Sequence, residues 1–138
     1  MQVEVRSRVP GHTSATTLPN VLVDLGDDGA TVRDLIQATV AAQVAATRGD
    51  IESGAAMLRR QYLIPEEVKE LASGAAPDER TEVGRAVRAF ELRVFVVFCN
   101  GRQMDGLDDP VRLRDGDPVV FLRLVPMMGG AAPAQRRP

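Results

Sequence analysis

The stretch LRVFVVFCNGRQM at residues 92–104 decides the fold class of this chain. Its first part, Leu92–Cys99, is rich in β-branched and aromatic side chains and is apolar on both faces. It therefore predicts an interior strand, or a strand covered on its second side. Asn100-Gly101 is the strongest two-residue hairpin signal in the chain, and it predicts a reversal into a short strand over Arg102–Met104. We expect a β-hairpin within a larger sheet.

Further strands are expected near both ends of the chain. Gln2–Val9 alternates apolar and polar residues, with Ser7 as its weak point, and Leu18–Leu25 alternates again. These two segments are expected to form an antiparallel pair. Pro118–Val125, with the sequence PVVFLRLV, predicts a last strand whose proline occupies the first position, where a strand tolerates it.

One long helix is predicted between the second and third strands. Thr31 is followed three residues later by Asp34, which resembles a capping box with the shorter carboxylate. The helix is expected to end near Arg48-Gly49. Its apolar stripe recurs at spacings of three and four and comprises Val32, Leu35, Ile36, Thr39, Val40 and Val44. Hairpins make neighbouring strands antiparallel, whereas a helical crossover allows parallel ones, so we expect an α+β fold with a mixed sheet.

The residues between this helix and the third strand, about 50–91, are interpreted as a helical insertion. Pro65 suits a first helical turn and predicts a short helix that reaches about Ala72. A second, amphipathic helix is predicted over Asp78–Phe90. It is expected to place Val83, Val87 and Phe90 on one side.

Composition limits the broad class of the protein. The 138 residues are 44% hydrophobic and 26% charged, with a formal net charge of −2, so we expect one soluble globular domain. This balance argues against a broadly basic nucleic-acid binder. Because there is neither an apolar run of about 20 residues nor an apolar N-terminal signal, we expect a cytoplasmic protein without a membrane partner.

The sequence offers little for metal or enzyme chemistry. It contains one histidine, His12, and one cysteine, Cys99, so neither a metal site nor a bound cofactor is expected. Glycine-rich phosphate loops, nucleophile elbows and metal-binding helices are missing from the sequence, which predicts a protein that is not an enzyme. Cys99 is expected to be a small buried or half-buried thiol. The aspartates between Asp105 and Asp117 lack the spacing of a calcium loop and are interpreted as solvated turns.

A pair of glycines, Gly129-Gly130, follows the last predicted strand and a Pro-Met-Met linker. Glycines lack a Cβ atom, so such a segment can pass through a channel too narrow for other residues and bring a backbone carbonyl close to reactive atoms. The alternative is that these glycines only begin a flexible tail.

Together these features resemble the ubiquitin-like β-grasp superfamily, which includes ubiquitin and the prokaryotic sulfur carriers for molybdopterin and thiamin. The order strand, strand, helix, strand, strand is that of the family. Leu113-Arg114-Asp115-Gly116-Asp117, followed by an apolar strand and Gly129-Gly130, looks like the Leu-x-Asp-Gly-Asp turn and glycine-ended tail of the sulfur carriers. The resemblance covers about residues 2–48 and 92–130, and the helical insertion is foreign to the small carriers. It implies a β-grasp fold with one main helix packed across the sheet.

The chain departs from the mature family members at its end. Eight residues, Ala131–Pro138, follow the second glycine, whose free carboxylate therefore does not yet exist. This arrangement resembles the precursors of ubiquitin and of several bacterial ubiquitin-like proteins. The resemblance implies a β-grasp domain over residues 1–130 and a propeptide-like tail over 131–138. It also implies a JAMM-type zinc metalloprotease that cuts between Gly130 and Ala131.

The function implied by the resemblance is that of a bacterial ubiquitin-like protein modifier. A partner activating enzyme would use ATP to adenylate the Gly130 carboxylate, and a conjugating enzyme would help to join it to a target protein. Lys69, the sole lysine, is the predicted acceptor for self-linked chains. Two alternatives stay open, a sulfur carrier that forms a Gly130 thiocarboxylate and a β-grasp interaction domain that is never cleaved. The residues expected to contact the activating enzyme along the tail are Arg123, Pro126, Met127 and Met128.

Overall fold

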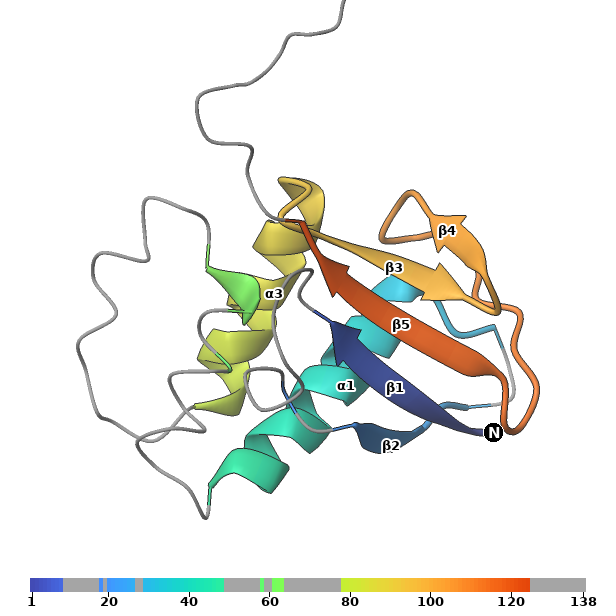
Figure 1. Ribbon diagram of the computed structural model, residues 1–138, viewed down its shortest axis with the longest axis horizontal. Helices are drawn as coiled ribbons and strands as arrows, with labels where there is room; N and C mark the ends of the chain where they lie inside the picture. The colour runs from blue at the N-terminus through green and yellow to red at the C-terminus, as the bar shows by residue number, and fades with distance from the viewer. Residues whose placement is uncertain are drawn as a thin grey trace, which may run out of the picture.

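Over the residues that the structure describes, a mixed five-stranded sheet is combined with two helices of 16 and 13 residues, as the computed structural model shows in Figure 1. The structure describes residues 1–8, 18, 20–26, 29–48, 58, 61–63 and 78–124. The predicted α+β class is confirmed. The elements in chain order are β1 (Gln2–Arg8), β2 (Val21–Asp24), α1 (Val32–Thr47), α3 (Glu79–Glu91), β3 (Phe95–Cys99), β4 (Arg102–Met104) and β5 (Pro118–Arg123).

The strands lie in the order β2-β1-β5-β3-β4, which can be followed from bottom to top in Figure 1. β1 and β5 are parallel, while β1–β2, β3–β4 and β3–β5 are antiparallel. The predicted mixed sheet and the antiparallel pairing of the first two strands are therefore confirmed. The last strand of the chain, β5, lies at the centre of the sheet and is hydrogen-bonded on both edges.

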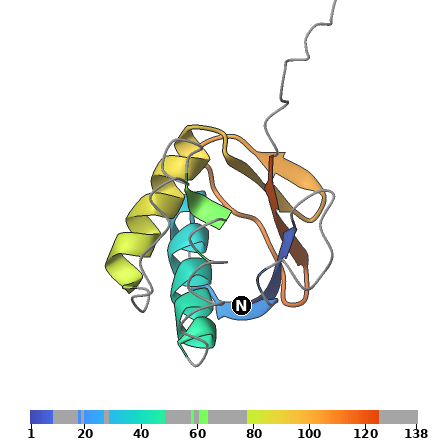
Figure 2. The ribbon, with the colours of Figure 1, turned by 60° about the vertical axis from the view of Figure 1, so that its left-hand side comes forward.

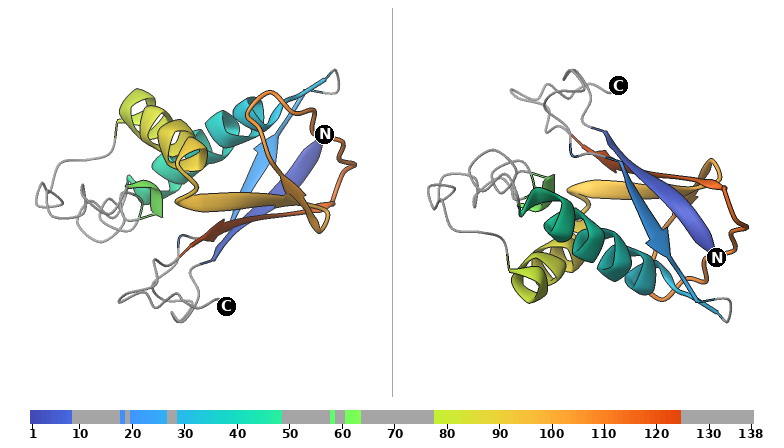
Figure 3. Two further views of the ribbon diagram at one scale, coloured as in Figure 1. Left: turned by 90° about the horizontal axis from the view of Figure 1, so that it is seen from above. Right: turned by 90° about the horizontal axis from the view of Figure 1, so that it is seen from below.

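Both helices lie on the same side of the sheet, as Figures 2 and 3 show from different directions. The expected capping box is present at the start of α1, where the Thr31 side chain accepts from the Asp34 amide and the Asp34 carboxylate accepts from the Thr31 amide. The predicted stripe of α1 is buried in full. It packs on the inward-facing residues of the strands, among them Val3, Val5 and Phe121, to form the core.

The Asn-Gly hairpin is confirmed, but the strand before it is shorter than predicted. Asn100 and Gly101 have φ angles of 52° and 82°, which are typical of a type I′ turn. β3 begins at Phe95 because Leu92 caps the preceding helix, its amide donating to the Arg88 carbonyl at 2.9 Å. Arg93, with φ 63°, then turns the chain toward the sheet.

The second predicted helix is confirmed as α3, with Asp78 as its N-cap, but its buried face differs in part from the expectation. Val83 and Val87 pack against the core that contains Phe90, as the predicted apolar side requires, but they are only half-buried. The buried positions are Glu82, Ala86, Ala89 and Phe90. Small alanines allow α3 to lie close to its neighbours, whereas the larger valines flank this contact and remain partly exposed to solvent.

Other predicted boundaries were too generous. β2 covers only Val21–Asp24 of the expected Leu18–Leu25, although Leu18 and Leu25 are themselves buried. β5 ends at Arg123, so the last strand stops before Val125. The ends of the first and last predicted strands, Val9 and Val125, lie outside the described residues, as does the predicted short helix from Pro65 to Ala72.

Candidate functional site

Most residues of the predicted conjugation tail lie outside the described residues. These are Pro126, Met127, Met128, Gly129, Gly130 and Ala131, together with the sole lysine, Lys69. Their proposed roles as tail contacts, conjugation site, cleavage site and self-acceptor therefore stay predictions. What the structure does describe is the point from which this tail departs.

The described chain ends next to the C-terminal end of α3. The Leu124 amide donates to the Val94 carbonyl at 2.8 Å, one position after the last residue of β5. Leu124 is 40% exposed. Gly130 follows six positions later, a length of chain that spans at most about 20 Å when fully extended.

Arg123 is the last residue of β5 and so lies within the predicted last strand, although it was also expected to contact the activating enzyme along the tail. It follows Val119 and Phe121 at alternate positions of β5, and those two side chains point into the core. The Arg123 guanidinium accordingly reaches the helical side of the sheet, where it donates to the Gln61 carbonyl at 2.8 Å and to the Leu63 carbonyl at 3.2 Å.

These bonds join the last strand directly to the insertion. Burial lowers the pKa of Arg123 from its ordinary value, because desolvation disfavours the charged form. The guanidinium remains the donor, and its two carbonyl partners offset part of that desolvation. Contact between Arg123 and an activating enzyme stays a prediction, and the structure gives this side chain an internal role that the sequence did not suggest.

The opposite face of the sheet carries an apolar patch, the outer patch, which consists of Val96, Phe98, Val120 and Leu122. Val96 pairs with Leu122, and Phe98 pairs with Val120, across the β3–β5 ladder. All four alternate with residues that point into the core, so they share the face away from the helices. Val96 is only 6% exposed, and the other three side chains are half-buried, so the outer patch is accessible only in part, although no described helix or strand lies on this face (Figures 2 and 3).

Charged residues of β1 border the outer patch. Arg6 is the register partner of Val120, and Arg8 is the partner of Leu122. The Arg6 guanidinium forms an ion pair with Glu4 at 3.2 Å, whereas Arg8 donates to the Ser7 carbonyl at 3.0 Å. This side of the sheet thus presents an apolar centre with a cationic margin, close to the strand from which the tail departs.

The Asp-Gly-Asp turn, which contributed to the family resemblance, fastens the start of β5 to the start of β1. The Asp115 carboxylate accepts from the Gln2 amide at 2.7 Å, and the Gly116 amide donates to the Gln2 carbonyl at 3.1 Å. Asp117 accepts from the Arg114 amide at 2.9 Å. The expected solvated turn is confirmed here, and its two carboxylates serve as backbone acceptors.

A buried chain of polar side chains links the sheet, α1 and the insertion, and the sequence analysis missed it. The Tyr62 hydroxyl donates to Gln43 Oε1 at 2.6 Å, and Gln43 Nε2 donates to Ser7 Oγ at 2.9 Å. Each of the three residues is 0% exposed. Ser7 is therefore no weak point of β1, because it is an inward-facing residue with a buried partner. Burial raises the pKa of Tyr62 well above its ordinary value, so the hydroxyl stays protonated.

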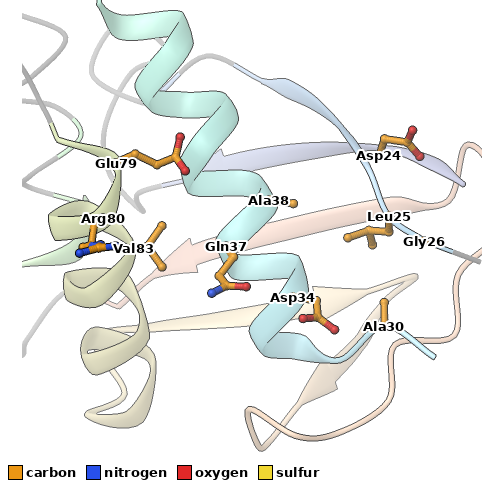
Figure 4. A pocket seen from close by; sticks show the side chains of 10 residues that line it. All are labelled: Asp24, Leu25, Gly26, Ala30, Asp34, Gln37, Ala38, Glu79, Arg80 and Val83. Atoms are coloured by element: carbon orange, nitrogen blue, oxygen red, sulfur yellow. The ribbon is translucent and has the colours of Figure 1, made fainter. Parts of the chain in front are cut away.

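An open groove of about 620 Å³ lies between β2, α1 and α3 (Figure 4). Asp34, Gln37 and Ala38 of α1 face it from one side, and Glu79 and Arg80 of α3 from another. Its lining mixes charged, polar and small apolar groups without a buried titratable group aimed into it. We assign no chemistry to this groove.

The described residues provide neither a metal centre nor a membrane span. Among them, no group of three or more His, Cys, Asp or Glu side chains is placed to hold a metal ion. Neither described helix combines the length and the apolar character needed to cross a bilayer. Cys99 is buried, as expected, and burial raises the pKa of its thiol to about 11.

Comparisons of the chain with protein-family models, with curated proteins and with solved structures found no match.

Proposed function

We propose that this chain is the precursor of a bacterial ubiquitin-like protein modifier that is cleaved after Gly130 and conjugated through the Gly130 carboxylate. The observation that carries the proposal is the place of β5. The strand that precedes the glycine pair lies at the centre of a mixed sheet, between β1 and β3, with α1 packed across one face. The mixed sheet and the helix packed across it agree with what the resemblance to the β-grasp superfamily implies.

The proposed chemistry takes place on partner enzymes. Hydrolysis of the peptide bond between Gly130 and Ala131 frees the Gly130 carboxylate. A carboxylate oxygen then attacks the α-phosphorus of ATP, and pyrophosphate leaves as an acyl-adenylate forms. A cysteine thiolate of the partner attacks the acyl carbon and displaces AMP, and an amine of the target finally displaces that thiolate to give an amide.

We expect the half-buried members of the outer patch, Phe98, Val120 and Leu122, to contribute a recognition surface for this scheme. These side chains lie on β3 and β5, so a partner bound there would contact the strand that leads into the tail. Because the segment from Leu124 to Gly130 spans at most about 20 Å, we expect the activating centre of the partner to lie within that distance of the end of β5.

The test uses the full chain, a JAMM-type metalloprotease, an activating enzyme, ATP and intact-mass measurement. We expect the mass to fall by that of residues 131–138, and we expect the product to support exchange of pyrophosphate into ATP. Gly130→Ala should block the cut, whereas Gly84→Ala, a substitution on the exposed side of α3, should leave it unchanged. A full chain that is never shortened, and a Gly130→Ala variant as active as its parent in cells, would support the uncleaved interaction domain instead.

A sulfur carrier is the alternative function, and the Asp-Gly-Asp turn favours it. Gly116 adopts φ 85° within that turn, as the glycine of such a motif must. Adding sulfide to the same reaction separates the two functions by their products. Replacement of oxygen by sulfur at Gly130 indicates the carrier, whereas a covalent adduct with a protein of the extract indicates the modifier. Lys69→Arg should then abolish any self-linked chains that use a lysine side chain.

A further inference from the structure

β2 is an edge strand, and its pairing with β1 determines which of its backbone groups face outward. Met1 and Leu25 exchange both of their bonds, since the Leu25 amide donates to the Met1 carbonyl at 2.8 Å and the Met1 ammonium donates to the Leu25 carbonyl at 3.2 Å. Hydrogen-bonded pairs alternate along an antiparallel ladder. The amides and carbonyls of Leu22 and Asp24 therefore point away from β1, toward the free edge of the sheet.

No strand among the described residues pairs with this edge, although β2 is short, with four residues, and ends with the charged Asp24. Leu22 is 65% exposed, the highest value among the large hydrophobic residues of the described chain. Proteins commonly protect a free edge with charged side chains, proline or very short strands. The two edges differ in their exposed side chains, because β4 exposes the polar Arg102 and Gln103, whereas β2 exposes the apolar Leu22 beside Asp24.

We propose that β2 pairs in antiparallel fashion with β2 of a second copy of this chain, with Leu22 opposite the partner's Leu22. This register brings two exposed apolar side chains together at a two-fold axis. It also places Asp24 opposite the partner's Asn20, so that a carboxylate faces an amide that can donate to it. The two five-stranded sheets then form one continuous sheet.

The neighbouring registers match less well. If one β2 strand slides by two residues, the outward-pointing backbone groups of the two strands can still pair. Leu22 then lies opposite either the charged Asp24 or the polar Asn20 of the second copy. If the strand slides by four residues, the two Asp24 carboxylates lie opposite each other, where like charges repel. Of these registers, only pairing centred on Leu22 matches apolar with apolar and charge with an amide. This interface does not depend on the function proposed above, since it uses neither the tail nor the outer patch.

The first test is the mass of the full chain by sedimentation velocity, over roughly 1 µM to 1 mM. We expect a concentration-dependent shift from the 14.9 kDa monomer to twice that mass. Leu22→Pro removes an outward amide from each copy without removing a bond to β1, so dimerisation should weaken at least about tenfold. Gln103→Pro is the matched control, because it removes an outward amide at the β4 edge and should leave dimerisation unchanged.

The second test is specific for the register and leaves the backbone intact. Leu22→Lys and Leu22→Glu each place like charges opposite each other at the two-fold axis, so each variant alone should be monomeric. An equimolar mixture of the two should form the heterodimer. A parent chain that remains monomeric throughout, a Leu22→Pro variant that dimerises like its parent, or a mixture that does not associate would overturn the proposal.

Discussion

Removing the hydroxyl of Tyr62 tests whether the buried polar chain stabilises the fold. In Tyr62→Phe the ring remains, and with it the edge-to-face contact with Phe95, whose centroid lies 5.2 Å away. What is lost is the 2.6 Å bond to Gln43 Oε1, which leaves a wholly buried amide oxygen without that donor.

The expected magnitude follows from this geometry. A buried acceptor left without its partner costs about 1–3 kcal/mol, so we expect the free energy of unfolding to fall by about 2 kcal/mol. For a chain of this length, that loss lowers the midpoint of thermal unfolding by about 6 °C. Urea unfolding at neutral pH, followed by circular dichroism, measures the free energy directly.

Thr39→Val is the matched control. Thr39 is equally buried, and its hydroxyl has no hydrogen-bond partner within the described structure. Replacing it with a methyl group should leave stability unchanged or raise it by up to about 1 kcal/mol. The reasoning is refuted if Tyr62→Phe unfolds within about 0.5 kcal/mol of its parent, or if Thr39→Val costs as much as Tyr62→Phe.

The remaining predictions concern pH and backbone conformation. Burial raises the pKa of Tyr62 in the folded chain above its value of 10.0 in the unfolded chain. The contribution of Tyr62 to the free energy of unfolding should therefore be constant well below pH 10 and should fall as the pH rises above 10. Tyr62→Phe should lack this loss. Burial raises the pKa of Cys99 to about 11, so the free energy of unfolding should also fall between about pH 9 and 11. The ultraviolet absorbance of the thiolate reports the ionisation of Cys99. Cys99→Ala should remove this contribution to the pH dependence. Gly116→Ala should destabilise the chain by about 1 kcal/mol because φ is 85° there. Gly84→Ala, in the exposed interior of α3 with open space around it, should instead stabilise it by about 0.5–1 kcal/mol, and urea unfolding of the pair decides between these signs.

Features that depend on neighbouring residues were predictable. The Thr31–Asp34 capping box, the Asn100-Gly101 turn and the proline at the start of β5 all appear as expected. In each case the interacting atoms are only a few residues apart, so the local sequence contains both partners.

The buried polar chain could not be predicted from its sequence neighbours. Gln43 lies 36 residues from Ser7 and 19 from Tyr62. One signal was available, because Gln43 falls on the apolar stripe of α1, four positions after Thr39 and three after Val40. A polar residue on a buried face requires a partner, but the pattern does not identify which one.

Arg123 shows the same limit at the site. Period-two alternation places it on the inward side of β5 with Val119 and Phe121, which argues against a role confined to the tail. Its partners, however, are backbone carbonyls of the insertion some sixty residues away. Alternation indicates the face of a strand but not which distant segment covers it.

The sequence by itself determined α1, α3, the Asn100-Gly101 turn and the approximate strands, because propensity, capping and alternation act over a few residues. It also placed a glycine pair beyond the last strand, on which the proposed function depends. Only the tertiary structure decided which positions of α3 are fully buried, what Arg123 binds and which backbone groups of β2 point away from β1. Each of these depends on contacts between segments that are remote in the chain, and such contacts are settled by packing of the whole core.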